Sequence, residues 1–185
     1  MKHRVLGNNL NPPFSNQLKQ VHFGMGCFWG VEKLFWQLEG IWCTAVGYGG
    51  SDFENPTYEL VCSGETGHAE IVKVVYDPKV INLNKLFRIF WESHDPTQGM
   101  RQGNDIGSQY RSMIIVNNSS ELNLAKESLK KVQEIFRKNR LEKITTEICI
   151  YQNFFYAEDY HQQYLSKNPD GYCNLNGLGI NLESI

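Results

Sequence analysis

The amino-acid sequence predicts one mixed α/β domain in which helices cover a sheet. Segments with the period of a strand alternate with segments with the period of a helix along most of the chain. The 185 residues, 41% of them apolar, are enough to bury one core but not two. No internal repeat and no linker rich in proline or glycine divides the chain, so a single domain is the simplest interpretation.

The start of the chain has no period. Residues 1–19, which include Asn8-Asn9-Leu10-Asn11-Pro12-Pro13, are expected to form an N-terminal extension or coil that lies on the domain. The domain is then expected to span residues 20–185, with a mobile tail from about residue 168. The basic residues near the N-terminus are followed by no apolar stretch, so we expect no secretory signal.

A strand, a helix and a second strand follow the extension. Strands are predicted over residues 20–23 and 41–48. Between them apolar residues recur at helical spacing, and a glycine closes the segment: Val31, Leu34, Phe35, Leu38 and Gly40. Cys27 therefore lies where a strand turns into a helix.

The same two periods predict the later elements. Strands are expected over 68–77, 110–117 and 144–151, and helices over 83–91, 122–136 and 154–166. Most of the 16 glycines lie before residue 108, many of them in long polar loops. Such loops are uncommon unless they serve a functional site. One shared site is therefore expected from residues 24–30, 47–67 and 95–110, with a glycine-containing tail at the C-terminal end.

Composition excludes several kinds of partner. Lys and Arg total 18 and Asp and Glu total 20, so the net charge is −2. This balance gives no long-range attraction to nucleic acid or to an anionic membrane. No run approaches the ~20 apolar residues of a membrane-spanning helix. We therefore expect neither nucleic acid nor a membrane as a partner.

The cysteines contain no C-x-x-C pair; they are Cys27, Cys43, Cys62, Cys149 and Cys173. An odd number without such pairs argues against a disulfide-stapled secreted scaffold and against a zinc site. The expected compartment is the reducing cytoplasm, where a buried cysteine is usually a small apolar residue. A chemical role for any of them needs a special local setting.

Cys27 has such a setting. At a strand-to-helix turn its side chain faces the free N–H groups and the positive end of the helix, which favour a thiolate. The next two residues, Phe28 and Trp29, cannot both point into the core, so at least one is expected to line a surface pocket. The alternative interpretation is a small buried cysteine in a tight turn.

Glu70 shares one face of the predicted strand 68–77 with Val72, Val74 and Tyr76. A carboxylate in apolar surroundings loses solvation, and its pKa rises. A carboxyl group with a raised pKa is a usable proton donor near neutral pH. The alternative is a solvated glutamate at the edge of the sheet, paired with a lysine.

Three polar groups in the loops and one thiol in the tail complete the candidates. Tyr58 follows Asn55-Pro56-Thr57, while Asp105 and Tyr110 lie close together in the next long loop. Tyrosine hydroxyls can hold a polar oxygen beside an apolar body, although ordinary half-buried packing is the alternative for each. A thiol on a tail, such as Cys173, can swing to meet an oxidised partner, and the alternative is an incidental exposed cysteine.

Taken together, these segments resemble the A-type peptide methionine sulfoxide reductases (MsrA). The resemblance covers roughly residues 20–176, in one order and at compatible spacings. The matching motifs are 26–30 (GCFWG), 55–58 (NPTY), 61–70 (VCSGETGHAE), 94–105 (HDPTQGMRQGND), 109–112 (QYRS) and 157–165 (AEDYHQQYL).

The resemblance implies a fold and an activity. The fold would be a two-layer α/β sandwich of ferredoxin-like type, with a mixed sheet and long active-site loops. The activity would be the thiol-dependent reduction of the S epimer of methionine sulfoxide, free or in proteins, without a metal or an organic cofactor. Oxidised proteins and thioredoxin would be the partners, and we expect a monomer.

The resemblance also implies the order of the chemistry. Cys27 would attack the sulfoxide sulfur, and Glu70 would bind and protonate the departing oxygen. The products would be methionine and a sulfenic acid on Cys27. Cys173 would then form a disulfide with Cys27, which thioredoxin would reduce.

The remaining roles implied by the resemblance concern substrate binding. Tyr58 and Tyr110 would hydrogen-bond the sulfoxide oxygen, and Asp105 would help to orient the site. Phe28 and Trp29 would form the pocket for the methyl group of the substrate.

One departure from the family pattern changes the expected thiol chemistry. Some relatives carry a second cysteine eight residues after the first tail cysteine, and here that position is Asn181. This chain is therefore expected to use a single resolving thiol. Cys43, Cys62 and Cys149 match no resolving position and are expected to be structural.

Two other classes of function compete with this interpretation. A cysteine hydrolase or acyl transferase would pair Cys27 with His68 or His161, form an acyl-enzyme and leave Cys173 without a role. A module without catalytic activity would bind a metal or a peptide through its cysteines and His68, although the cysteines lack paired ligand spacings.

Overall fold

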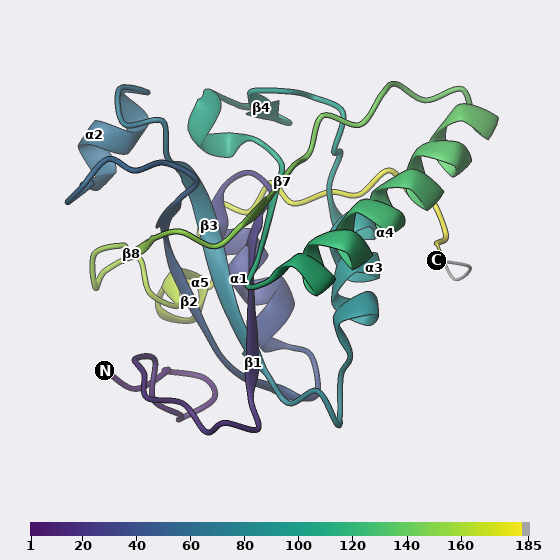
Figure 1. Cartoon of the computed structure of the whole chain (residues 1–185). Helices are drawn as coiled ribbons and strands as arrows, with labels where there is room; N and C mark the ends of the chain where they lie inside the picture. Colours follow the sequence, from purple (N-terminus) through teal and green to yellow (C-terminus); the bar gives the residue numbers. More distant parts are fainter. Residues whose placement is uncertain (183–185) are drawn as a thin grey trace.

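Residues 1–182 are described by the computed structural model, in which strands and helices alternate along the chain (Figure 1). The helices are α1 (Phe28–Trp36), α2 (Tyr58–Cys62), α3 (Leu83–Ser93), α4 (Ser119–Lys138) and α5 (Tyr164–Lys167), with one 3₁₀ turn, η1 (Ser108–Tyr110). The strands are β1 (Lys19–Gly24), β2 (Ile41–Gly49), β3 (Ala69–Tyr76), β4 (Arg101–Gln102), β5 (Asp105–Ile106), β6 (Met113–Val116), β7 (Glu147–Ile150) and β8 (Phe154–Tyr156).

Within this part of the chain, six strands form one sheet in the order β7-β6-β1-β3-β2-β8. β1 pairs with β3 and with β6 in antiparallel orientation, and β2 pairs with β3 along its whole length. Only the pair of β6 and β7 is parallel among the described strand pairs of this sheet. The predicted mixed sheet in an α/β fold is therefore confirmed, while the ferredoxin-like topology stays a prediction.

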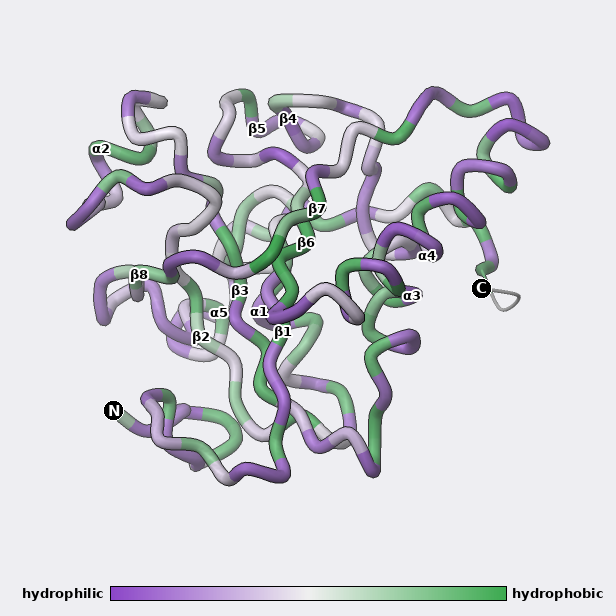
Figure 2. Tube along the Cα trace, viewed as in Figure 1, coloured by the Kyte–Doolittle hydropathy of each residue, from purple (hydrophilic) through white to green (hydrophobic). Residues whose placement is uncertain are grey.

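The main core lies between one face of the sheet and α1, α3 and α4. As the alternation of strand 68–77 predicts, Val72, Val74 and Tyr76 all belong to this core. The Phe23 ring stacks on Phe35 at a centroid distance of 5.0 Å and on Phe90 at 5.3 Å. Hydrophobic residues accordingly gather on the strands at the centre of the molecule (Figure 2).

The opposite face of the sheet is covered by the N-terminal segment and by residues near β8. Leu10, 1% exposed, packs with Cys43, Ala45 and Val75 on this face. No helix within residues 1–182 has the length and apolar character needed to cross a lipid bilayer.

The predicted helices 83–91 and 122–136 are confirmed as α3 and α4, which extend slightly further. Each begins at an asparagine cap: Asn82 Oδ1 accepts the Lys85 amide N–H at 2.8 Å, and Asn118 Oδ1 accepts the Glu121 amide N–H at 3.0 Å. These side chains satisfy backbone donors that lack a partner within the helix, which explains where the helices start.

The predicted helix 154–166 is wrong. Phe154–Tyr156 form strand β8 beside β2, with Phe155 opposite Tyr48, and only the four residues of α5 are helical. The side chain of Gln162 bonds both the N–H and the C=O of Val46, so this segment is held by contacts to the sheet. These long-range bonds replace the local bonds of a helix.

The long loops contain short helices and strands that their polar sequence does not predict. Residues 49–67 include α2, and residues 95–110 include the β4–β5 hairpin and η1. The strands expected over 110–117 and 144–151 are shorter than predicted, and Tyr110 belongs to η1 rather than to a strand.

The N-terminal segment makes a testable contribution to stability. Leu10→Ala removes a fully buried side chain and is expected to lower the free energy of unfolding by about 2–5 kcal/mol. Val5 lies in the same segment but is 48% exposed, so Val5→Ala is expected to stay within about 0.5 kcal/mol. Urea unfolding measures both, and equal values for the two variants would show that the segment does not pack as described.

Candidate active site

Cys27 is the N-cap of α1, immediately after the turn that ends β1. The preceding Gly26 has a φ of +93°, and a Cβ there would lie 2.7 Å from the Gln102 side chain. Only glycine fits such a position without strain. The predicted strand-to-helix turn is therefore confirmed, and it places the thiol at the start of α1.

Glu70 meets the same helix start from β3. Its Oε2 accepts the Phe28 amide N–H at 3.0 Å, and the residue is 2% exposed. Burial raises the pKa of Glu70 to about 8, Asp105 adds to the rise, and the Phe28 amide opposes it. As the strand pattern predicts, the carboxyl group is protonated at neutral pH.

The Cys27 thiol does not have the depressed pKa that its position at a helix N-terminus predicts. Burial raises its pKa well above the ordinary value, and the charge of Glu70 raises it further. The Trp29 amide N–H acts in the opposite direction but is outweighed. Desolvation is thus stronger than the helix end in this conformation, and Cys27 holds its proton.

Tyr58 comes from the loop after β2, Asp105 and Tyr110 come from the loop after α3, and all three act electrostatically on the same centre. Burial and then Glu70 raise the pKa of each phenol, so both hydroxyls keep their protons. Asp105 and Cys27 also raise the pKa of Tyr110. The structure therefore brings the phenols and the Asp105 carboxyl close to Cys27 and Glu70.

The C-terminal tail lies against the same site. The Tyr172 hydroxyl donates to the Asp105 carboxyl group, with its oxygen 3.1 and 3.2 Å from the two carboxyl oxygens. A Cβ added at Gly30 would lie 2.9 Å from the Cys173 Sγ, so this thiol packs on the first turn of α1. Cys173 also contributes to the raised pKa of Cys27, as expected for a nearby group.

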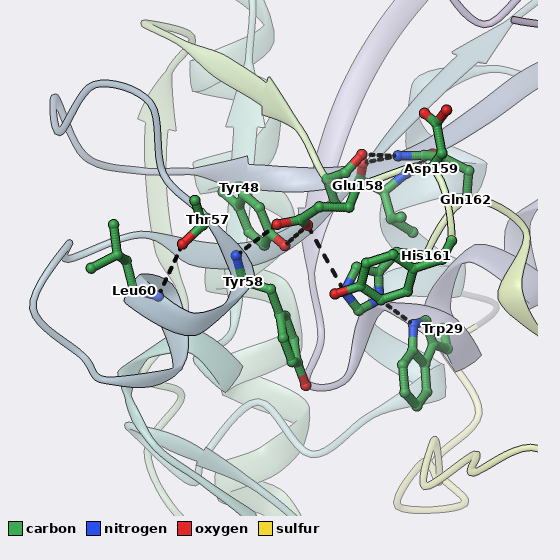
Figure 3. Close-up of polar contacts among 12 residues, drawn as sticks. Trp29, Tyr48, Thr57, Tyr58, Leu60, Glu158, Asp159, His161 and Gln162 are labelled. Carbon is green, nitrogen blue, oxygen red and sulfur yellow. Dashed lines mark hydrogen bonds and ion pairs between the residues drawn. The ribbon is translucent and has the colours of Figure 1, made fainter.

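The two aromatic residues after Cys27 differ in exposure. Phe28 is 1% exposed and belongs to the main core. Trp29 is half-buried, and its ring stacks on Tyr164 at a centroid distance of 3.9 Å. Its indole N–H donates to His161 Nδ1 at 3.0 Å, so Trp29 is held from two sides (Figure 3).

The sequence patterns missed Glu158, whose carboxylate joins several parts of the site (Figure 3). Glu158 accepts the Tyr58 amide N–H at 2.9 Å and the Tyr48 hydroxyl at 2.7 Å. In the helix expected over 154–166, Glu158 would be an ordinary surface residue. One signal was available in the sequence. From Glu158 to Gln163 every residue but Tyr160 is polar, so this segment lacks the apolar residues that the buried face of a helix needs.

The other cysteines differ in their distance from this chemistry. Cys62 is exposed at the end of α2, and Tyr58 is among the groups that shift the pKa of its thiol, so Cys62 borders the site. Cys43 is buried on the opposite face of the sheet, and Cys149 lies in β7.

The arrangement does not fit a cysteine–histidine hydrolase or a metal-binding module. His68 Nε2 lies 2.8 Å from the Phe53 carbonyl oxygen, while His161 Nδ1 is occupied by Trp29. Neither histidine is among the groups that shift the pKa of Cys27. Among the described residues, no group of three or more His, Cys, Asp or Glu side chains could hold a metal ion.

Comparison with known proteins gives a consistent result. The family described as "Peptide methionine sulfoxide reductase" matches residues 19–181. The peptide methionine sulfoxide reductase MsrA of Brucella ovis is 56% identical over 178 residues, which are 96% of this chain and 82% of that protein.

Solved structures include proteins with a similar fold. Methionine sulfoxide reductase A of Corynebacterium diphtheriae has a TM-score of 0.87 and 43% identity, over 92% of this chain and 83% of that one. Mxr1 from Saccharomyces cerevisiae in reduced form has a TM-score of 0.82 and 34% identity, over 91% of this chain and 96% of that one. The match to the family over nearly the whole chain, together with these identities, shows that the chain belongs to the peptide methionine sulfoxide reductase family.

Proposed function

We propose that this chain reduces methionine S-sulfoxide, free or in proteins, to methionine, with Cys27 as the nucleophile and Glu70 as the proton donor. One contact at the start of α1 is the main support for this proposal. The amide N–H of Phe28, the residue after Cys27, donates to the Glu70 carboxyl group at 3.0 Å, so this acid lies next to Cys27. A protonated acid beside a thiol is the pair that reduction of a sulfoxide requires.

The first step transfers oxygen from one sulfur to the other. The Cys27 sulfur attacks the sulfoxide sulfur and forms a sulfur–sulfur bond, while Glu70 gives its proton to the sulfoxide oxygen. The protonated oxygen then moves to the Cys27 sulfur, so that a bond between oxygen and Cys27 forms while the sulfur–oxygen bond of the substrate and the sulfur–sulfur bond break. The products are a sulfenic acid on Cys27 and methionine, which leaves. Cys27 loses two electrons, the substrate sulfur gains two, and the proton released by the thiol restores Glu70.

The surrounding groups bind the substrate. Tyr58 and Tyr110 donate hydrogen bonds to the sulfoxide oxygen, which their raised pKa values support because both hydroxyls keep their protons. Asp105 orients the site from the β4–β5 hairpin. Phe28 and Trp29 line the apolar pocket for the methyl group.

The second step closes a disulfide and releases water. The Cys173 thiol attacks the sulfenic sulfur of Cys27, a sulfur–sulfur bond forms, and the hydroxyl leaves as water with the proton of Cys173. The packing of Cys173 Sγ against Gly30 supports this pairing. Thioredoxin, the dithiol reductant of the scheme, then returns both cysteines to thiols by disulfide exchange.

We further propose that the protein works in the cytoplasm as a monomer. Both cysteines must return to thiols in every cycle, which a reducing compartment favours. All of the proposed catalytic and binding groups come from a single chain.

Substitutions of Cys27 and Cys173 are expected to block different steps of the reaction. Cys27→Ser should abolish methionine formation from a methionine sulfoxide peptide with any reductant, since serine cannot accept the oxygen. Cys173→Ser should keep turnover with dithiothreitol but lose it with thioredoxin. Methionine counted by chromatography separates these outcomes, and equal activity of Cys173→Ser with both reductants would remove Cys173 from the scheme.

Glu70→Gln keeps the shape of the side chain but removes its acidic proton. At neutral pH the single-turnover rate of methionine formation is expected to fall about 100-fold or more. Since the pKa of Glu70 is about 8, the wild-type acid loses its proton above that pH. The ratio of wild-type to variant rates should therefore shrink as the pH rises through 8, and a constant ratio would exclude Glu70 as the acid.

The stability of the same variant is its control. Between the ordinary glutamate pKa of about 4.3 and the native value, the unfolded chain binds fewer protons, so wild-type stability falls as the pH rises. Glu70→Gln lacks this loss and is expected to be at least as stable as the wild type at pH 8. A lower urea midpoint would show that the substitution damages the fold.

Gly30→Ala tests the position of the tail. The added methyl group would lie 2.9 Å from Cys173 Sγ and 3.3 Å from Leu175 Cβ, so the tail must move away from α1. Disulfide formation after one turnover is expected to slow about tenfold, because Cys173 is displaced from the first turn of α1, where Cys27 lies. Alanine is favourable in a helix, so folding should be kept. An unchanged rate of thiol loss would show that Cys173 reacts from another position.

A further inference from the structure

We propose that Glu158 is a positioning residue for the reduction: its carboxylate holds Tyr58 directly and Trp29 through His161. This inference deepens the proposed function and rests on it. Glu158 lies in the turn after β8, and three elements of the site converge on its two carboxylate oxygens (Figure 3).

The first contact fixes Tyr58. Tyr58 is the first residue of α2, and its amide N–H has no acceptor within that helix. Glu158 Oε1 accepts this N–H at 2.9 Å, while the Thr57 side chain accepts the Leu60 amide at 3.4 Å. Glu158 thereby anchors the backbone of the first residue of α2, next to the Thr57 cap, and helps to fix the position from which the Tyr58 phenol extends.

The second contact acts on Trp29 through a histidine tautomer. The Trp29 indole N–H can only donate, so His161 Nδ1, 3.0 Å away, must be the bare nitrogen. Burial lowers the pKa of His161, against the opposing effect of Glu158, so the ring is neutral at pH 7 and its proton sits on Nε2. This nitrogen lies 3.9 Å from Glu158 Oε2, whose negative charge favours the proton there.

A third contact anchors the carboxylate itself. The Tyr48 hydroxyl donates to Glu158 Oε2 at 2.7 Å, and Tyr48 is fully buried in β2, directly opposite Glu70 in the strand register. Partial burial alone would raise the pKa of Glu158, but the Tyr58 amide and the Tyr48 hydroxyl hold it below its usual value. Glu158 is therefore ionised when it acts on Tyr58 and His161.

These contacts predict how removal of the Glu158 charge affects the binding of methionine sulfoxide. In Glu158→Gln the amide oxygen can still accept the Tyr58 N–H, but the negative charge beside His161 Nε2 is gone. Only the hydrogen bond from Trp29 then favours the Nε2 proton, so the other tautomer of His161 becomes more populated. The other tautomer cannot accept from Trp29, so the wall of the methyl pocket loosens. The half-saturating concentration of methionine sulfoxide in single turnover should rise about tenfold, while the limiting rate changes less than about threefold.

The tautomer of His161 provides a measurement that a general loss of stability would not change. In ¹⁵N-labelled resting protein, the His161 signals of the wild type should show a protonated Nε2 and a bare Nδ1. Glu158→Gln should shift them towards the other tautomer and move the Trp29 indole signal. Glu158→Asp, which keeps the charge, should restore the wild-type tautomer at least in part.

The neighbouring Asp159 is the matched control, since it is exposed and Asp159→Asn removes the same charge one residue away. This variant should leave the His161 signals and the half-saturating concentration unchanged. If Glu158→Gln does not fold, Glu158→Asp and Tyr48→Phe serve instead, and each should disturb the His161 signals in part. Wild-type His161 and Trp29 signals in every folded Glu158 and Tyr48 variant, or an equal effect of Asp159→Asn, would overturn the proposal.

Failure of the proposed function would be seen separately. The NMR signals are measured without substrate, so they test the positioning of His161 and Trp29 whatever the reaction is. Absence of methionine formation by the wild-type protein would contradict the proposed reduction itself.

Discussion

The site depends on the burial of one carboxyl group against the first turn of a helix. Glu70 is 2% exposed, and its Oε2 satisfies the Phe28 amide N–H at 3.0 Å. This bond occupies a backbone donor that α1 cannot satisfy internally, and it fixes the carboxyl group next to Cys27. Burial keeps Glu70 protonated at neutral pH, although the Phe28 amide opposes this effect. The hydrogen bond therefore places the acid, and burial keeps its proton on.

The order of the strands explains why these groups meet. β1 and β3 are antiparallel neighbours, so the end of β1 lies beside the start of β3, and a Cβ on Gly24 would lie 3.3 Å from the Glu70 carbonyl oxygen. The end of β2 reaches the same edge, with Gly49 opposite Ala69. The loop between β2 and β3 can therefore bring α2 and Tyr58 to this edge, while Glu158 ties α2 to the turn after β8.

The Cys27 thiol shows the competition between a local and a long-range effect. The helix N-terminus favours a thiolate, but burial and the Glu70 carboxyl group act more strongly and raise the pKa. In this conformation the tail also contributes, because Cys173 packs against Gly30 beside the thiol. In the proposed mechanism the thiolate therefore arises together with proton transfer to the substrate oxygen, since the resting thiol keeps its proton.

Local periodicity was enough to predict the strand-to-helix turn at Cys27 and the apolar face that Glu70 shares with Val72. Both features depend on side chains within a few residues of one another, which the order of residues determines directly. Periodicity failed after residue 153, where pairing of Phe155 with Tyr48 and bonds to Val46 outweighed a helical pattern. The role inferred for Glu158 and the contact of Cys173 with α1 could be decided only by tertiary structure, because each joins residues more than 90 positions apart in the chain.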